Sequence, residues 1–165
     1  SRCWRARLGR KNKFGALRLE TPMAYWLMKS EPDAWSWDRQ VAKGAKGEAW
    51  TGVRNHAAKL NLMKMRTGDQ GFFYHSNTGK EIVGIVEIIR EHRPDPTAKP
   101  GEPWVAVDVK ALEPMPRPVT LVAIKAEPKL KDMALLKQSR LSVQPVTAAE
   151  WAMVRDMGGL KSWAD

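Results

Sequence analysis

The sequence predicts an α+β domain in which short helices pack around a small, curved or barrel-like mixed sheet. The expected strands and helices do not alternate as they would in a doubly wound parallel fold. The length of 165 residues suits one compact domain, and 43% of the residues are hydrophobic, which is enough for a sizeable core. No apolar run approaches the ~20 residues of a membrane-spanning helix, so a membrane span is excluded, and we expect no membrane partner.

Strands and helices are mixed in the first half of the domain. Apolar residues at helical spacing, such as Val53, Ala57 and Leu60, predict a helix that ends near Gly68 and presents Asn55 and Lys59 on another face. Gly84 interrupts an apolar strand and suggests a bulge or a close backbone approach. The expected elements are a strand over 25–29, a turn over 30–33, a helix over 33–42, a helix from 53, and a hairpin of strands 71–76 and 82–89.

Prolines and helix caps mark the boundaries of the expected elements in the second half of the domain. Residues 94–103 contain four prolines and form a loop, while residues 104–112 alternate as a half-solvated strand does. Prolines 114, 116 and 118 are expected to end that strand. Short helices over 120–126 and 132–137 precede a strand over 141–143. Thr147 and Glu150 fit a capping box, and Val146 with Trp151 fit a hydrophobic staple, which favours a structural role for Trp151.

Most of the positive charge lies at the beginning of the chain. There are 28 Lys and Arg against 18 Asp and Glu, a net charge of +10. Residues 1–22 carry seven bases and one acid, or +6, which leaves +4 for residues 23–165. We interpret residues 1–22 as a basic leader or extension outside the fold, and residues 23–165 as one domain. A basic arm that grips phosphates is the alternative for residues 1–22.

The reactive side chains are sparse. Cys3 is the single cysteine, which excludes an intrachain disulfide and a zinc site built on cysteine pairs and favours a cytoplasmic setting. His56, His75 and His92 lack metal-ligand spacing, so we expect no metal and no cofactor. No phosphate loop, dinucleotide fingerprint or nucleophile elbow is present. We therefore expect no catalytic residues and predict that the chain is not an enzyme.

The aromatic residues favour binding of a planar ligand. Eight of the thirteen are Trp, and several stand beside amide or hydroxyl groups at the ends of expected elements. An aromatic face stacks on a nucleobase, while neighbouring polar groups read its edge. Two alternatives stay open. One is a nucleotide or nucleoside hydrolase with Asp33, Glu48 or His75 as general base, and the other is a protein-interaction module that uses exposed Trp side chains.

Four short motifs in order, the last of them in two parts, carry a family resemblance. They are YWLMKSEPD at 25–33, WTGVRN at 50–55, FYHS at 73–76, RLSV at 140–143 and PVT at 145–147. Together they resemble the EVE domain family, which includes the thymocyte nuclear protein type, over residues 24 to about 155. The resemblance implies a PUA-like mixed β pseudo-barrel with flanking short helices, related to the YTH readers of methylated adenosine. It also implies a pocket for a modified base of DNA or RNA.

The resemblance also implies where the base binds. We expect a pocket walled by Trp50 with Trp35 or Tyr74, and Asn55 at an amide-bearing edge of the base. We expect Arg54, Arg140 and Ser142 to contact phosphate or the edge of the base, and a buried structural position beside a carboxylate is the alternative for Arg54. Glu31-Pro32 departs from the YTH pattern, so a modified cytosine is as admissible as N6-methyladenine. The predicted ligand-binding residues are Lys29, Ser30, Trp35, Trp50, Thr51, Arg54, Asn55, Tyr74, His75, Ser76, Arg140 and Ser142. The expected partner is DNA or RNA carrying a modified base, bound by a monomer.

Overall fold

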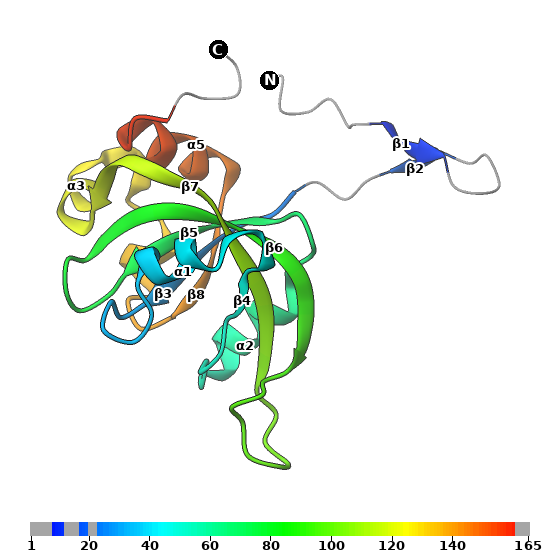
Figure 1. Cartoon of the computed structure of the whole chain (residues 1–165). Helices are drawn as coiled ribbons and strands as arrows, with labels where there is room; N and C mark the ends of the chain where they lie inside the picture. Colours follow the sequence, from blue (N-terminus) through cyan, green and yellow to red (C-terminus); the bar gives the residue numbers. More distant parts are fainter. Residues whose placement is uncertain (1–7, 12–16, 20–22, 161–165) are drawn as a thin grey trace.

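A mixed six-stranded sheet forms the centre of the computed structural model, which describes residues 8–11, 17–19 and 23–160 (Figure 1). Its strand order is β4-β7-β6-β5-β3-β8. The strands are β3 (Tyr25–Ser30), β4 (Glu48–Ala49), β5 (Gln70–His75), β6 (Glu81–Pro94), β7 (Val105–Thr120) and β8 (Val143–Val146). The helices are α1 (Trp37–Ala42), η2 (Gly44–Lys46), α2 (His56–Lys64), α3 (Leu121–Ala126), η3 (Pro128–Leu130), α4 (Ala134–Lys137) and α5 (Ala148–Met157). The predicted α+β class with a mixed sheet and short helices is confirmed.

A separate two-stranded sheet lies near the beginning of the chain. Its strands, β1 (Leu8–Lys11) and β2 (Leu17–Leu19), pair with each other in antiparallel fashion and not with the six-stranded sheet. The remainder of residues 1–22 lies outside the described residues. The interpretation of this segment as a basic leader or extension therefore stays a prediction.

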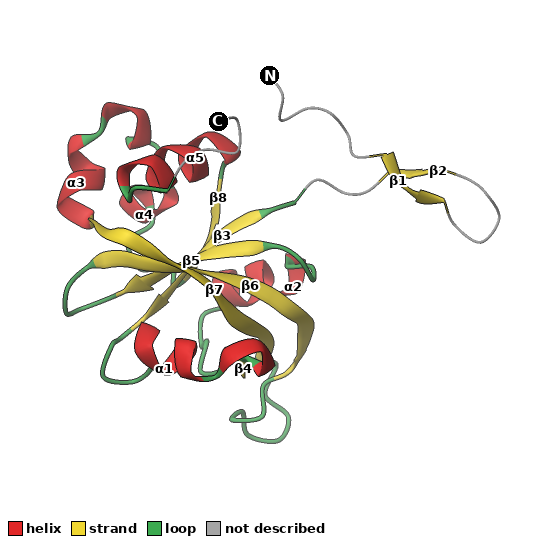
Figure 2. Cartoon of the chain, turned by 45° about the horizontal axis from the view of Figure 1, so that its top comes forward, coloured by secondary structure: helices red, strands yellow, loops and turns green. Residues whose placement is uncertain are grey.

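The pairing of β3 brings together residues that are far apart in sequence. β3 runs parallel to β5 and antiparallel to β8. This register places Lys29 beside Tyr74 and Ser30 beside His75. Next to β5, the long antiparallel strands β6 and β7 contain several register shifts, which bend strands and increase their twist. Figures 1 and 2 show both strands curving across the molecule.

Helices cover both faces of the sheet, which gives the protein two hydrophobic cores (Figure 2). The first core lies under α1 and α2 and contains Met28, Phe73 and Trp50. The second core lies under α3, α4 and α5 and contains Leu27 and Phe72, which alternate with the first set along β3 and β5. Both strands are therefore buried on both sides.

Trp151 belongs to the second core, as the capping pattern indicates. Thr147 Oγ1 accepts from the Glu150 N–H at 3.2 Å, and the Thr147 N–H donates to Glu150 Oε1 at 3.0 Å, so the capping box is formed. The Trp151 ring stacks on Phe72 and Tyr25, with centroid distances of 3.9 and 4.5 Å. The side chain is 2% exposed. The predicted helix start and the structural role of Trp151 are confirmed.

The three prolines of β7 do not end the strand, and that prediction is wrong. β7 continues to Thr120 and pairs with β6 as far as Glu81. β4 pairs with β7 only at Val109 and Asp108, so in the described chain the proline-rich half of β7 forms an outer edge of the sheet. A proline is tolerated at an edge because its missing N–H can face outward.

Two helices begin later than the sequence predicts. The helix expected from residue 33 begins at Trp37, after Ser36 caps it by accepting from the Arg39 N–H. The helix expected from residue 53 begins at His56, and Asn55 is its N-cap rather than a residue on one of its faces. Side-chain caps of this kind stabilise a helix end by satisfying a free backbone N–H.

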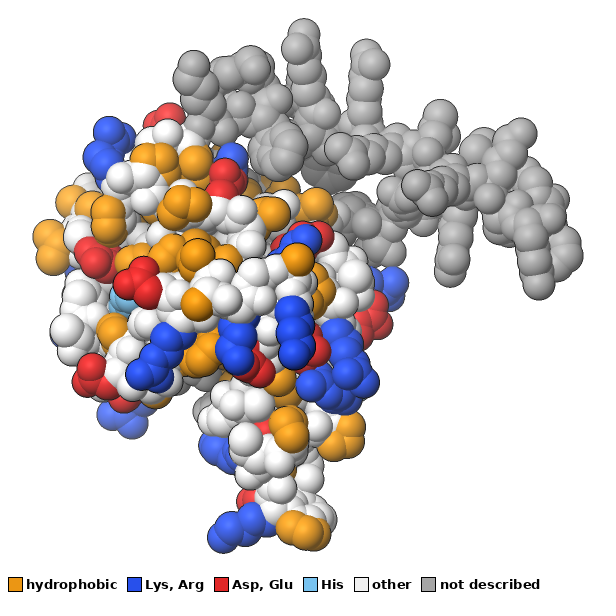
Figure 3. Space-filling model, viewed as in Figure 1, with side chains coloured by type: hydrophobic (Ala, Val, Ile, Leu, Met, Phe, Trp, Pro, Cys, Tyr) orange, Lys and Arg blue, Asp and Glu red, His pale blue; other side chains and the backbone are white. Residues whose placement is uncertain are grey.

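Charges of both signs share the surface. On the face shown in Figure 3, Lys and Arg side chains lie among Asp and Glu side chains. Several form ion pairs, including Lys43 with Glu48 at 3.0 Å and Lys110 with Glu87 at 3.3 Å. This mixture agrees with the modest charge of +4 that the sequence assigns to residues 23–165.

Gly84 should not tolerate a side chain. A Cβ there would lie 2.4 Å from the Trp37 ring, which occupies the space above the strand, and the β5–β6 register shifts beside it. We expect Gly84→Ala to lower the free energy of unfolding by about 1–3 kcal/mol, because the Trp37 ring must move. Urea unfolding measures the change.

Gly71→Ala is the matched control on the neighbouring strand. A Cβ at Gly71 would meet its nearest neighbour at 3.5 Å, an ordinary contact. We expect this variant to change the free energy of unfolding by less than about 1 kcal/mol. Equal losses in the two variants would contradict the proposed close approach of Trp37.

Candidate functional site

A cavity of about 560 Å³ opens beside the end of β3. This volume lies within the ~300–1,000 Å³ that small-molecule sites occupy. Its walls come from the end of β3 and the following loop, β4 and the segment after it, the loop after β6, and the residue before β8. The lining residues are Lys29, Ser30, Ala34, Trp35, Glu48, Ala49, Trp50, Thr51, Gly52, Val53, Arg54, Pro96, Thr97 and Ser142.

Seven of the twelve predicted ligand-binding residues meet at this cavity. They are Lys29, Ser30, Trp35, Trp50, Thr51, Arg54 and Ser142. The main-chain bond from the Lys29 N–H to the Ser142 carbonyl, at 2.9 Å, joins two of the walls. Segments separated by more than a hundred residues in the sequence therefore converge on one site.

The two tryptophans of the cavity are held in different ways. Trp50 is 6% exposed and packs edge-to-face on Phe73 in the first core, with a centroid distance of 5.4 Å. Trp35 is half-buried, and its indole N–H donates to Gln40 Oε1 at 2.9 Å. Gln40 is fully buried and anchored to the Val109 carbonyl. Trp35 is thus the more accessible of two fixed aromatic surfaces.

Lys29 and Ser30 position the loops that surround them. Lys29 Nζ donates to the Ser139 carbonyl at 2.6 Å, and burial lowers the pKa of Lys29. Ser30 Oγ donates to the Trp35 carbonyl at 2.7 Å. The Lys29 ammonium therefore secures the turn before Ser142, while the Ser30 hydroxyl secures the loop that carries Trp35.

Five predicted residues lie outside the lining of the cavity: Asn55, Tyr74, His75, Ser76 and Arg140. Asn55 Oδ1 accepts from the Ala58 N–H, as the cap of α2 requires. Tyr74 is 4% exposed and belongs to the second core, so the sheet separates it from the first core and Trp50. His75 Nε2 accepts from the Trp37 N–H at 3.1 Å, and burial lowers the pKa of His75.

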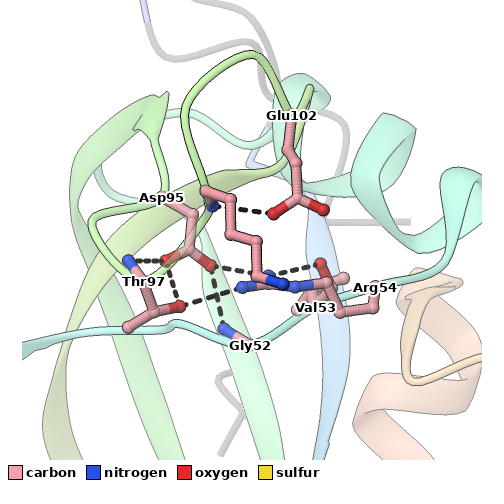
Figure 4. Close-up of polar contacts among 7 residues, drawn as sticks. Gly52, Val53, Arg54, Asp95, Thr97 and Glu102 are labelled. Carbon is pink, nitrogen blue, oxygen red and sulfur yellow. Dashed lines mark hydrogen bonds and ion pairs between the residues drawn. The ribbon is translucent and has the colours of Figure 1, made fainter.

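Asp95 connects the loop after β6 to the cavity wall (Figure 4). Its Oδ2 accepts from the Gly52 N–H at 2.9 Å and from Arg54 Nη1 at 3.0 Å. Its Oδ1 accepts from the Thr97 N–H at 2.7 Å and from Thr97 Oγ1 at 2.6 Å. Arg54 Nη2 in turn donates to Thr97 Oγ1 at 3.0 Å. Arg54 therefore partners a carboxylate, but its side chain is 37% exposed rather than buried, and its contact with a ligand stays a prediction.

Comparison with known proteins identifies the family of the chain. The EVE domain profile matches residues 24–157. This chain belongs to the EVE domain family. Mouse thymocyte nuclear protein 1 is 34% identical to the chain over an alignment of 161 positions, and the match covers 79% of this chain and 71% of the mouse protein.

Solved structures support the same assignment for this EVE domain. A protein from Rhodopseudomonas palustris is 69% identical, with a TM-score of 0.78 over 83% of this chain and 94% of that one. Human THYN1, solved in complex with DNA that contains 5-methylcytosine, is 31% identical, with a TM-score of 0.76 over 84% of this chain and 99% of that one. The YTH domain of Zygosaccharomyces rouxii MRB1 is 18% identical, with a TM-score of 0.51, and shares the fold.

The described part of the EVE domain presents neither a metal-binding cluster nor a membrane-spanning helix. Within residues 8–11, 17–19 and 23–160, His, Cys, Asp and Glu form no group of three that could hold a metal ion. Over the same residues, none of the helices has the length and apolar character that a membrane crossing requires.

The structure adds cavity residues that the sequence prediction missed. Thr97 and Pro96 come from the loop after β6, and Asp95 fixes both beside Gly52. A local signal exists, because an Asp followed two residues later by Thr favours a side-chain turn. Gly52 and Asp95 are 43 residues apart, so a local sequence pattern cannot predict their contact. Glu48 was predicted only as a general base of the hydrolase alternative, yet it lines the cavity.

The carboxyl group of Asp95 stays ionised in the folded EVE domain. Burial alone would raise its pKa, but hydrogen bonds from the Thr97 hydroxyl, the Gly52 and Thr97 N–H groups and Arg54 outweigh burial and lower the pKa to about 2. An unfolded Asp titrates at about pH 4. The stabilisation is therefore complete above about pH 4 and is lost as the pH falls toward 2.

We expect Asp95→Asn to lower the free energy of unfolding at pH 7 by about 2–3 kcal/mol, because the amide cannot replace all the charge-assisted bonds. Between about pH 4 and pH 2, stability should fall less in the variant than in the wild type. Denaturant unfolding across this pH range measures both effects.

Asp132→Asn is the control, since the Asp132 side chain is 75% exposed and 4.0 Å from Lys137. We expect this control to lower the free energy of unfolding by less than about 0.5 kcal/mol. Parallel pH curves for wild type and Asp95→Asn would refute the role assigned to Asp95.

Proposed function

We propose that this EVE domain binds DNA or RNA by taking one modified nucleobase into the cavity beside β3. The observation that carries the proposal is the convergence of Trp35 and Trp50 with the hydroxyls of Ser30, Thr51 and Ser142 around one cavity. A base needs flat surfaces for stacking and polar groups at its edge. The human relative solved with 5-methylcytosine DNA supports the proposal, because the two folds correspond over 84% of this chain.

The energetics suit a base presented by a single strand or extruded from a duplex. Extrusion costs a few kcal/mol, and stacking contributes ~1–3 kcal/mol per base. The cavity walls need little rearrangement to accept a base, since Trp35 is fixed through Gln40 and Trp50 through Phe73. A preorganised aromatic site loses less entropy on binding than a flexible one.

Arg54 is the cavity residue best placed to contact a phosphate. Its guanidinium is oriented by Asp95 and Thr97, yet 37% of the side chain remains exposed. Lys29 is more enclosed, because its Nζ donates to the Ser139 carbonyl. With only +4 on residues 23–165, we propose that the base pocket, rather than bulk charge, supplies most of the affinity.

The cavity favours binding over hydrolysis. Of the three general bases considered, Asp33 and His75 lie outside the lining. Glu48 is present, but a hydrogen bond from Lys43 is the main cause that lowers its pKa, which weakens a carboxylate as a base. We therefore propose a binding module that acts as a monomer in the cytoplasm on DNA or RNA.

Trp35 offers the test of the pocket. We expect Trp35→Ala to weaken binding of the preferred modified oligonucleotide about tenfold or more, because one stacking surface is lost. Trp35→Phe keeps an aromatic plane and should retain most of the affinity. Fluorescence anisotropy on matched oligonucleotides with and without 5-methylcytosine or N6-methyladenine measures binding, and thermal unfolding verifies that each variant is folded.

Trp50→Ala is a poor test by comparison, because Trp50 belongs to the first core and its loss would destabilise the domain. The pocket proposal fails if the wild-type protein does not distinguish modified from unmodified oligonucleotides. It also fails if folded Trp35→Ala binds as tightly as the wild type.

Salt dependence tests the balance between pocket and charge. We expect the logarithm of the association constant to fall with the logarithm of salt concentration at a slope of about −3 or shallower, because few phosphates are neutralised. Titration from low to moderate salt measures this slope. A slope of about −6 or steeper would show that basic residues, including those of segment 1–22, dominate binding.

A further inference from the structure

One acidic side chain, that of Glu48, lines the cavity among the described residues. Glu48 belongs to β4, two residues before Trp50, and its side chain is 39% exposed. Its Oε2 lies 3.0 Å from Lys43 Nζ, and its Oε1 accepts from the Ala49 N–H at 3.2 Å. The carboxylate is thus held in place from two directions.

The Glu48 side chain is an ionised carboxylate at neutral pH and therefore acts as a hydrogen-bond acceptor. The hydrogen bond from Lys43 is the main cause that lowers the pKa of Glu48, although burial opposes it. An ionised carboxylate offers about four acceptor positions and no donor. One contact to each oxygen leaves further acceptor positions, and the exposed part of the side chain makes them accessible to a ligand.

The cations that line the cavity have acceptors within the protein. Lys29 Nζ donates to the Ser139 carbonyl, and Arg54 donates to Asp95 and Thr97. Lys43, the partner of Glu48, does not line the cavity. A ligand that enters therefore meets a fixed acceptor in Glu48, while the two cations of the lining already have acceptors within the protein.

We infer that Glu48 makes the cavity selective for bases that carry an amino group on C4 of a pyrimidine or C6 of a purine. The amino N–H of cytosine or adenine donates to a carboxylate. The carbonyl oxygen of uracil, thymine or hypoxanthine at the same position has no proton to donate and is repelled by the negative charge. This inference rests on the proposed function and assigns its class of base.

The inference can be tested directly by comparing two bases of nearly equal shape, one with the amino group and one with a carbonyl. Cytosine differs from uracil, and 5-methylcytosine from thymine, by an amino group in place of a carbonyl and by the absence of a proton on the adjacent ring nitrogen. Adenine differs from hypoxanthine in the same way. We would place each base at the same position of a single-stranded oligonucleotide, which removes the cost of opening a duplex. Anisotropy titrations of the full chain should show the amino member of at least one pair bound about tenfold more tightly.

Two variants assign that preference to Glu48. Glu48→Gln introduces an amide that can donate to a carbonyl, so the ratio of affinities should fall toward one. Lys43→Met removes one contact of Glu48 but keeps the carboxylate and its hydrogen bond from the Ala49 N–H, so the amino preference should remain. The Lys43–Glu48 pair is exposed by 45% and 39%, and both variants should fold. The comparison of amino and carbonyl oligonucleotides uses the wild-type protein, so it does not depend on whether a variant folds.

Each outcome has a distinct meaning. Absence of binding to every oligonucleotide of the panel overturns the proposed function and this inference with it. Equal affinity within all pairs, or a preference for the carbonyl member, overturns the inference and leaves the proposed function intact. An unchanged ratio in Glu48→Gln, or the same loss in Lys43→Met, overturns the assignment to Glu48, because the ion pair would then act structurally.

Discussion

Burial of the sheet on both faces is the constraint on which the rest of the structure depends. β3 and β5 are neighbouring interior strands of the sheet, with one core on each side, so most of their consecutive residues are apolar or small. Polar residues can then be accommodated chiefly at the strand ends. Lys29 and Ser30 occupy such an end, and the cavity opens there. The location of the site thus follows from the way the core is packed.

Buried hydrogen bonds, rather than surface ion pairs, fix the shape of this site. Asp95 has a fully buried side chain, and it satisfies donors from Gly52, Arg54 and Thr97. A buried carboxylate is costly unless such bonds compensate for lost hydration. Because those donors border the cavity, one residue outside the lining organises two of its walls. Gln40 likewise fixes Trp35 while it is itself anchored to the Val109 carbonyl.

The chemistry of the cavity accounts for the proposed function better than overall charge does. The net charge of +10 suggests a strongly basic protein, but the charge of residues 23–165 is only +4, with acids and bases intermixed on the face in Figure 3. What distinguishes the site is the combination of fixed indole rings, hydroxyl groups and one ionised carboxylate. Such a set suits a planar, uncharged heterocycle, since stacking and directional hydrogen bonds do not require a large opposite charge.

The sequence by itself determined the α+β class, most elements and the family, because these depend on short-range patterns. The capping box at Thr147, the β3 strand and the turn after β5 are encoded within a few residues each. The tertiary structure alone decided that Tyr74 joins the second core, that β7 continues past its prolines, and that Asp95 meets Arg54, 41 residues away. Each depends on strand register and sheet order, which arise from packing between distant segments.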